Sequence, residues 1–316
     1  MGAAAEKNAA NIEKGSPVAH RSSNGTFTAV MSNLKISIVT PTFNCATTLR
    51  ETIESVLRQD YGHWEHIVMD GGSTDGTLEI IKSYPHLQWM SEKDEGHYDA
   101  MNKGISRATG DVIAILNADD TYRPNTLTRV AGAFDQHPKW DALFGDIVYV
   151  DGESREIVRR HEARYDYDVL RFGNICYVIH PTLFVRKSTY QRIGVYRHKM
   201  FLNCCDVDFI LRLGQEGCRV GHIPEYLANY RIHQHGQSAD SRVMRNMARE
   251  YLAIRKEHGF PDGVAGRALE FFAKVKRQLQ KIIYRGKPDL LSGKRYLKKH
   301  MRDQTTFSSN VGVDKL

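Results

Sequence analysis

Short apolar runs alternate with segments of helical periodicity in the first half of the chain. The runs at residues 35–40, 66–69 and 112–116 are rich in Ile and Val, and each ends at polar or acidic residues. Such runs are typical of strands that are covered on both faces of a sheet. Residues 49–57 carry apolar side chains at helical spacing, which predicts a helix between the first two strands. This alternation predicts an α/β fold with a mostly parallel sheet flanked by helices.

The pattern changes in the second half of the chain. A strand is predicted at residues 143–150, followed by a turn at Asp151-Gly152 and a returning strand at 156–158. Another strand is predicted at 180–185, and a helix opens near 203–208. No composition break separates this half from the first. We therefore interpret it as an elaboration of the same domain.

Acidic residues follow two of the predicted strands. Asp70 ends the second, and Asp119 and Asp120 lie at or just beyond the end of the run at 112–116. In an open α/β sheet the carboxyl ends of the strands form the ligand-binding edge. Adjacent carboxylates repel each other unless a cation or donors compensate them, and a divalent metal carrying a phosphorylated ligand would do so. A cap by Asp120 before Pro124, beside a solvated Asp119, is the structural alternative.

Four other polar groups have both a functional and a structural interpretation. Residues 70–77 are either a ligand-binding loop or a well-built turn. Residues 94–104 form a loop-to-helix junction suited to anions, or a solvated charge cluster. Asp206 is a helix cap or a catalytic carboxylate, and His233 is a surface histidine or a metal ligand.

Composition limits the cellular setting. The chain has 316 residues, 41% of them hydrophobic, and no apolar run approaches the roughly 18 residues of a membrane-spanning helix. Its five cysteines include no CxxC pair, so a reducing cytoplasm is expected rather than disulfides or a thiolate zinc site. Residues 1–33 lack a continuous apolar segment and are expected to be a disordered extension. The main domain is expected at residues 34–241.

The net charge of +7 is concentrated near the C-terminus. Residues 242–303 contain 17 Lys and Arg against 6 Asp and Glu, with helices predicted at 244–258, 266–284 and 290–302 and a flexible tail at 304–316. A basic amphipathic helix can lie on an anionic membrane surface, or it can pack on the domain with solvated lysines. Nucleic-acid binding is not predicted, because no recognised module accompanies the charge.

Two common nucleotide-binding classes are excluded by the loop at residues 41–45. It contains no glycine, so the dinucleotide fingerprint GxGxxG is absent, and no P-loop lysine follows the strand. These absences argue against a nicotinamide oxidoreductase and against a nucleoside triphosphatase.

The ordered motifs resemble family 2 glycosyltransferases over residues 35–238. The segment ISIVTPTFN at 36–44 resembles the family's opening, and DGGSTDGT at 70–77 resembles its second motif. DEGHYDAMNKG at 94–104 is similar to the third motif, and NADD at 117–120 is similar to the metal-binding DxD region. Four motifs in this order are far more specific than any one of them.

The resemblance implies a GT-A fold and an inverting, metal-dependent transfer, of hexosyltransferase type, from a nucleotide-diphospho-sugar to an acceptor hydroxyl. The base pocket, the ribose and the diphosphate would involve Thr40, Pro41, Phe43, Asp70, Asp94, Lys103, Asn117, Ala118 and Asp120. Within this set, Thr40, Pro41 and Phe43 would line the base pocket and Asp70 would bind the base. Asp94 and Lys103 would lie near the ribose and diphosphate. Asp119 would ligate Mg²⁺ or Mn²⁺, with His233 on a late polar loop as a further ligand.

The same resemblance assigns the catalytic base to Asp206, at the start of a later helix. The family often has a Glu-Asp pair there, whereas this chain has Cys205-Asp206. Asn117 replaces the first acid of the DxD motif. These departures leave open an alternative, a non-catalytic nucleotide-sugar-binding or scaffold protein on the same fold. Asp208, two positions along the helix, is expected to face away from Asp206.

The resemblance also implies the partners. A UDP-type donor is favoured, with a saccharide or a lipid-linked saccharide as acceptor, in the biosynthesis of a cell-surface polysaccharide or glycolipid. The QxxRW signature of processive synthases is absent, which favours the addition of single sugars. We expect a cytoplasmic protein, with peripheral attachment to the inner face of the cell membrane as an open alternative.

Overall fold

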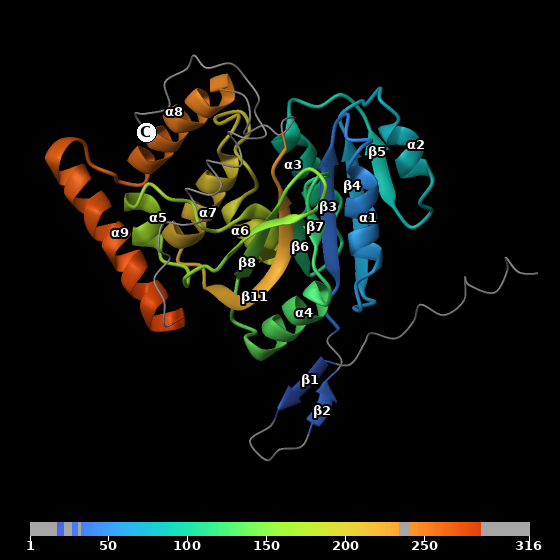
Figure 1. Cartoon of the computed structure of the whole chain (residues 1–316), viewed down its shortest axis with the longest axis horizontal. Coiled ribbons are helices and arrows are strands. Elements are labelled where there is room, and N and C mark those ends of the chain that lie inside the picture. Colours follow the sequence, from blue (N-terminus) through green and yellow to red (C-terminus); the bar gives the residue numbers. More distant parts are fainter. Residues whose placement is uncertain (1–17, 22–26, 31–32, 234–240, 286–316) are drawn as a thin grey trace, which may run out of the picture.

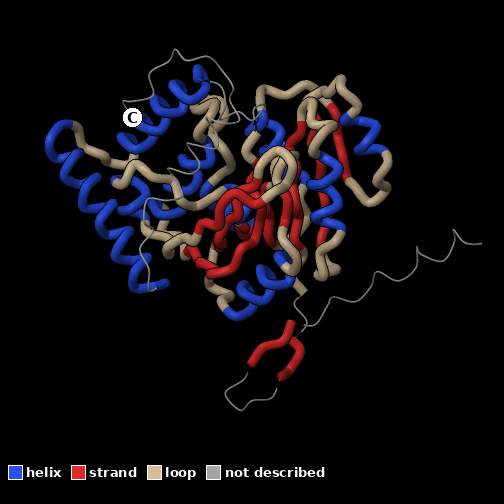
Figure 2. Tube along the Cα trace, viewed as in Figure 1, coloured by secondary structure: helices blue, strands red, loops and turns tan. Residues whose placement is uncertain are grey.

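The computed structural model describes residues 18–21, 27–30, 33–233 and 241–285. Its body is one large sheet with helices on both sides (Figure 1, Figure 2). The strands of this sheet are β3 (Ile36–Thr42), β4 (Trp64–Asp70), β5 (Gln88–Ser91), β6 (Val112–Ile115), β7 (Thr121–Tyr122), β8 (Ala142–Val150), β9 (Glu156–Arg160), β10 (Phe184–Arg186) and β11 (Val220–Arg231).

The strand order is β5-β4-β3-β6-β10-β8-β11-β7, with β9 paired to β8. The first four strands are parallel, as the strand–helix alternation predicts. The second half of the sheet is mixed, because β10 runs antiparallel to both of its neighbours while β11 is parallel to β8. The α/β fold is thus confirmed, and the sheet is less parallel than expected.

The strands bury side chains on both faces, which explains their continuous apolar sequences. In β3, Ile36 and Ile38 pack into one core cluster and Val39 into another. One face is covered by α1 (Leu49–Leu57), α2 (Thr77–Lys82) and α4 (Thr126–Gln136). The other is covered by α3 (His97–Arg107), α5 (Tyr167–Phe172), α6 (Lys187–Ile193) and α7 (Cys205–Gln215).

Helix α3 lies unusually close to the sheet. A Cβ atom added at Gly104 would overlap Cγ1 of Val39 in β3 and lie 3.2 Å from Cγ of Met69. Only glycine allows this approach. The glycine that ends the third sequence motif therefore sets the position of the helix that the motif begins.

Two further helices follow the sheet. They are α8 (Ser241–Glu257) and α9 (Gly263–Arg285), and α9 packs on α5 at the edge of the molecule (Figure 1). Among the described residues, no helix has the length and apolar character needed to cross a bilayer. The helix predicted at 290–302 and the tail predicted at 304–316 lie outside the described residues.

One prediction of local structure is wrong. Residues 180–185 do not form one strand, because the 3₁₀ helix η1 (His180–Thr182), with Pro181 in its first turn, precedes β10. Within the extension expected to be disordered, β1 (Val18–Arg21) and β2 (Phe27–Val30) pair as an antiparallel hairpin. The sequence between them contains Asn24-Gly25, a residue pair typical of hairpin turns. Most of the remaining residues of 1–33 lie outside the described residues.

Candidate active site

Three of the motif loops meet at the carboxyl edge of β3 and β4. A Cβ atom added at Gly71 would lie 2.6 Å from Oδ2 of Asp94 and 3.4 Å from Cδ2 of Phe43. The second motif therefore passes close to the third and to the first. The Phe43 ring is 60% exposed, although it lies directly beyond a fully buried strand. An exposed ring beside a carboxylate can stack on a nucleobase while the carboxylate accepts hydrogen bonds.

Asp70 organises this edge from within. Its Oδ2 accepts hydrogen bonds from the backbone N–H groups of Gly72 and Ser73, both at 3.1 Å, and from the Ser91 hydroxyl at 2.6 Å. The Ser73 hydroxyl donates to Oδ1, and Asp70 is only 2% exposed. Four internal donors hold the carboxylate in place. Its predicted contact with the base stays a prediction.

Thr40 and Pro41 lie inside β3 and are buried. The Thr40 hydroxyl is 2.9 Å from Nε2 of His66, and burial lowers the pKa of that imidazole to about 3. His66 is therefore neutral at physiological pH. Of the three residues assigned to the base pocket, only Phe43 presents its side chain to solvent; Thr40 and Pro41 support the strand below it.

Lys103, assigned to the diphosphate, already has two anionic partners. Its Nζ lies 2.8 Å from Oε1 of Glu92 and 3.0 Å from Oδ2 of Asp99. Hydrogen bonding to Glu92 and then to Asp99 raises the pKa of Lys103. A diphosphate would have to compete with both carboxylates, so a direct contact from Lys103 stays a prediction.

Asp119 and His233 come together across 114 positions of the chain. Nε2 of His233 lies 2.9 Å from Oδ2 of Asp119, and both side chains are partly exposed, at 21% and 29%. Asp119 follows β6, so it lies at the same sheet edge as Asp70. The two residues predicted as metal ligands are therefore adjacent.

Asp120 points inward instead. It is 1% exposed, and its carboxylate accepts hydrogen bonds from the Arg231 backbone N–H at 3.0 Å and from Nδ2 of Asn117 at 3.1 Å. Burial, and then the charge of Asp119, raise the pKa of Asp120 well above its usual range. Ala118 is buried in the cluster beneath α1 and α2. Asn117, Ala118 and Asp120 thus shape the turn that presents Asp119.

Both carboxylates of the Asp119-Asp120 pair are engaged by neighbouring residues. A cation was expected to relieve the repulsion between them, but Asp120 accepts hydrogen bonds from Asn117 and Arg231, and Asp119 lies against His233. The described residues include no group of three or more His, Cys, Asp or Glu side chains placed to hold a metal. A carboxylate with an imidazole still suits Mg²⁺ or Mn²⁺, which commonly takes phosphate oxygens and water as its other ligands. The pair fits a metal shared with a bound diphosphate.

Arg231 has a structural role that no sequence motif predicted. This arginine is 5% exposed, and its guanidinium donates to the backbone carbonyls of Asp119 at 2.9 Å and Gly152 at 3.1 Å. It also pairs with Glu51 in α1. Thr48 and Glu51 have the spacing of a capping box, but Thr48 makes no side-chain cap, and the Glu51 carboxylate pairs with the arginine instead. Arg231 joins α1, the β8–β9 hairpin and the Asp119 turn.

Asp206 lies in the first turn of α7, as predicted, and is held by a residue of the third motif. The Tyr98 hydroxyl donates to Oδ1 of Asp206 at 2.8 Å and lies 3.3 Å from the carbonyl oxygen of Asn203. Tyr98 belongs to the first turn of α3, which begins beyond the end of β5. The half-buried Asp206 carboxylate is therefore tied to the ligand-binding edge of the sheet.

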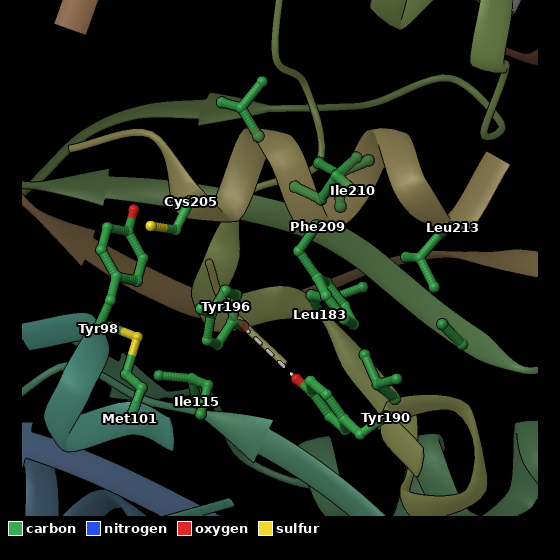
Figure 3. Close-up of a cluster of buried hydrophobic side chains, with 14 of the residues drawn as sticks. Tyr98, Met101, Ile115, Leu183, Tyr190, Tyr196, Cys205, Phe209, Ile210 and Leu213 are labelled. Atoms are coloured by element: carbon green, nitrogen blue, oxygen red, sulfur yellow. Dashed lines mark hydrogen bonds between the residues drawn. The ribbon is translucent and has the colours of Figure 1, made fainter. Parts of the chain in front are cut away.

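Two histidines lie near Asp206. The His97 ring centre is 3.9 Å from that of Tyr98, and burial lowers the pKa of His97 to about 4 despite the opposing charge of Asp206. Nε2 of His180 is 2.7 Å from the Tyr196 hydroxyl, and burial lowers the pKa of His180 as well. Tyr98 and Tyr196 belong to the cluster in Figure 3. Neutral imidazoles can donate or accept hydrogen bonds to a hydroxylic ligand.

The neighbours of Asp206 on α7 have structural roles. Cys205 is fully buried in the core (Figure 3), and its thiol contacts the Phe201 carbonyl oxygen at 2.8 Å. Asp208 pairs with Arg197 and with Arg212, the latter at 3.0 Å. Asp208 thus faces away from Asp206, which confirms the prediction. A cysteine at position 205 fills the core and does not remove an acid from the Asp206 surface.

Comparison with known proteins supports the resemblance. Residues 37–194 match the sequence profile of Glycosyl transferase family 2. A PGL/p-HBAD biosynthesis glycosyltransferase of Mycobacterium tuberculosis is 37% identical over 183 residues, which cover 56% of this chain and 68% of that protein. The putative teichuronic acid biosynthesis glycosyltransferase TuaG of Bacillus subtilis is 36% identical over 107 residues, covering 31% of this chain and 42% of the relative.

Solved structures share the fold. S. aureus TarS 1-349 in complex with UDP-GlcNAc superposes with a TM-score of 0.58 at 16% identity, covering 86% of this chain and 80% of that one. The mannosyltransferase PcManGT from Pyrobaculum calidifontis, in complex with GDP-Man and Mn²⁺, gives a TM-score of 0.53 at 20% identity, with coverages of 86% and 83%. The matched profile, the sequence relatives and the GT-A-type architecture together show that this chain belongs to glycosyltransferase family 2.

Proposed function

We propose that this glycosyltransferase moves a sugar from a nucleotide-diphosphate donor to an acceptor hydroxyl with inversion at the anomeric carbon. The observation that carries the proposal is the hydrogen bond from Tyr98 to Asp206. It fixes a half-buried carboxylate at the edge where the motif loops meet, which is what a general base requires. Asp208, the other acid in the first turn of α7, is paired with two arginines, so Asp206 is the carboxylate of this turn that can act as the base.

The donor site is proposed at the sheet edge formed by Phe43, Asp94 and Asp119. Phe43 offers an exposed ring for the base, and Asp94 lies beside it above Gly71. We favour a UDP-type donor. The complexes of the two structural neighbours, with UDP-GlcNAc and with GDP-Man, support a nucleotide-sugar as the donor.

Asp119 and His233 are proposed to hold a divalent metal, Mg²⁺ or Mn²⁺, together with the donor diphosphate. Such an ion, when bound, offsets the charge that develops on the departing nucleoside diphosphate. The protein's own contribution is positional. Arg231 fixes the backbone of the Asp119 turn, and Asn117 holds Asp120 inward. Of the two adjacent carboxylates, only that of Asp119 therefore faces the proposed donor site.

The chemistry of Asp206 follows from its position. The acceptor hydroxyl gives its proton to the carboxylate while its oxygen forms a bond to the anomeric carbon. On the opposite face the bond from that carbon to the diphosphate oxygen breaks, and the nucleoside diphosphate leaves with the electron pair. General-base assistance of this kind contributes roughly 10²–10⁴-fold to the rate. We propose that His97 and His180, which lie near Asp206 and whose pKa values burial lowers, orient a hydroxylic acceptor.

We further propose that the acceptor is a saccharide or a lipid-linked saccharide in the biosynthesis of a cell-surface polysaccharide or glycolipid. The sequence relatives named for PGL/p-HBAD and teichuronic acid biosynthesis support this class. A cytoplasmic site of action is proposed because all five cysteines are free thiols, three of them buried.

A screen of nucleotide-sugars tests the donor proposal. The melting temperature of the full chain is measured with UDP-, GDP- and TDP-sugars in the presence and absence of Mn²⁺. A ligand that binds only the native state raises the apparent stability by about 2.7 kcal/mol at 100 times its Kd. A metal-dependent rise with one nucleotide class supports the proposal, whereas no rise with any nucleotide-sugar contradicts it. Release of nucleoside diphosphate then separates an enzyme from a non-catalytic binding protein.

A further inference from the structure

Two basic residues of helix α9 point into the protein and orient the helix. Arg277 and Lys281 are 5% and 2% exposed, and both approach the fully buried Glu162, at 2.6 Å and 3.5 Å from its Oε2. The Lys281 ammonium also donates to the His161 carbonyl oxygen at 2.6 Å. An unpaired charge in this position would be costly, so these contacts fix which side of α9 faces the domain.

The apolar side of α9 therefore faces outward. This arrangement is the reverse of an ordinary surface helix, whose apolar stripe packs on the core. The exposed positions recur at helical spacing, and Ile283 reaches 80% exposure and Phe272 64%. We call this surface the α9 outer face; its members are Val264, Phe271, Phe272, Val275, Leu279, Ile282 and Ile283. A contiguous apolar surface of this kind indicates an interaction site.

Basic residues border the α9 outer face. Lys274 and Lys276 have side chains 48% and 50% exposed, and Arg267 is exposed in the preceding turn. Lys274 pairs with Glu270, the one acid of α9, which also lies beside Arg255. Lys276 pairs with Asp166 at 2.6 Å. The surface thus combines aromatic and aliphatic side chains with a positively charged margin. This combination is characteristic of helices that lie in the headgroup region of an anionic membrane.

The charge distribution disfavours the other occupants. A second copy joined across a two-fold axis would bring one basic margin against the same basic margin. The chain's own segment 286–316 contains seven Lys and Arg against three Asp and Glu, so it is also basic. An anionic lipid surface is complementary to both the margin and this segment, because such a surface attracts clustered basic residues.

We propose that the α9 outer face docks the protein on an anionic phospholipid surface, with Phe271 and Phe272 inserted among the headgroups. The proposal concerns a surface separate from the donor site and is independent of the proposed reaction. In functional terms it would hold the enzyme at the interface where a lipid-linked acceptor is found.

The test is sedimentation of the full chain with vesicles. One set contains phosphatidylcholine alone, and the other contains about one third phosphatidylglycerol, enough to give a strongly negative surface. The binding variant is F271S/F272S. The matched control is Leu202→Ser, which removes a side chain that is 66% exposed and lies outside α9. A second comparison tests the basic margin. K274E/K276E reverses the charge of two lysines of α9, and Lys82→Glu, at an exposed lysine on α2, is its control.

We expect the wild-type chain to sediment with the anionic vesicles. F271S/F272S should bind at least about tenfold more weakly, because it lacks the two aromatic side chains that would insert among the headgroups. K274E/K276E should weaken binding to anionic vesicles only. Both control variants should bind like the wild type, and F271S/F272S and the two controls should keep the wild-type melting temperature. Failure of the full chain to bind either vesicle, equal binding by F271S/F272S, or a dimer that F271S/F272S dissociates would overturn the proposal.

Discussion

The Tyr98 hydroxyl donates a hydrogen bond to Asp206 across 108 positions of the chain, at 2.8 Å. It connects the helix that begins at the third motif with the helix that carries the proposed base. Tyr98 is buried, and burial together with the Asp206 charge raises the pKa of its hydroxyl well above the usual value. The tyrosine therefore stays protonated and acts as a donor. In this arrangement Tyr98 positions Asp206.

Replacement of this tyrosine tests the positioning role. Tyr98→Phe removes only the hydroxyl, and a hydrogen bond to a charged group is worth about 1.5–3 kcal/mol. We expect kcat to fall by roughly 10- to 100-fold while the donor KM changes little. Steady-state kinetics at saturating acceptor measure this. Tyr190→Phe, which removes a hydroxyl that bonds Tyr196 in the same core, is the control and should keep near-normal kcat. A donor KM that rises as much as kcat falls would contradict the role.

Arg231 should matter for both stability and the donor site. Arg231→Gln leaves the carbonyls of Asp119 and Gly152 without their donor and breaks the pair with Glu51. We expect the free energy of unfolding to fall by about 2–4 kcal/mol, measured by urea denaturation. Metal-dependent donor binding should weaken in the remaining folded protein. Arg129→Gln, at an exposed pair with Glu225, should change stability by less than about 1 kcal/mol.

Asp119 is the residue whose loss should remove metal dependence. Asp119→Asn keeps the shape of the turn but removes the charge, so calorimetric binding of the donor should become weak and insensitive to Mn²⁺ or chelator. Asp111→Asn, at the other end of β6, is the matched control and should bind like the wild type. Donor affinity that is equal in Asp119→Asn and the wild type, with and without chelator, would exclude the metal role of this pair.

Glu65 predicts a specific pH dependence of stability. Burial opposes its ionisation, but hydrogen bonds from Lys35, Ser37 and Thr109 outweigh burial and lower the pKa of Glu65 to about 2. A carboxylate with a depressed pKa stabilises the fold above its unfolded pKa, near 4.5, and this contribution is lost as the pH falls toward 2.

Glu65→Gln should therefore cost about 2–3 kcal/mol above pH 5, and the difference from the wild type should shrink between about pH 4.5 and 2. Urea unfolding at a series of pH values measures this difference. Glu216→Gln, at an exposed position, should show no such trend. A pH-independent cost for Glu65→Gln would show that packing, and not the charge, accounts for the effect.

The sequence predicted the strands and the acidic residues at their ends because both signals are local. A run such as residues 112–116 is apolar on every position, and the structure buries it on both sides. The adjacency of Asp119 and His233 followed from the family resemblance. In contrast, the donors that satisfy Asp120 come from Asn117 nearby and from Arg231, 111 positions away. No local sequence pattern predicts that Arg231 contacts Asp120.

Long-range ion pairs explain the other differences. Glu51 has the right spacing from Thr48 for a capping box, but the buried guanidinium of Arg231 takes its carboxylate. In α9, periodicity predicted an apolar stripe beside lysines and left its direction open. Glu162, 115 positions from Arg277, fixes that direction and turns the apolar stripe outward. Tyr98 was within reach of prediction, because it belongs to the third motif.

The most direct test of the central claim is the turnover of Asp206→Asn. The substitution keeps the size of the side chain and its hydrogen-bond acceptor for Tyr98, but it removes the group that takes the acceptor proton. We expect donor binding by calorimetry to match the wild type and kcat to fall by roughly 10²–10⁴-fold. Asp168→Asn, at an exposed carboxylate on α5, should retain full turnover. A folded Asp206→Asn protein with near-normal kcat would contradict the assignment of Asp206 as the base.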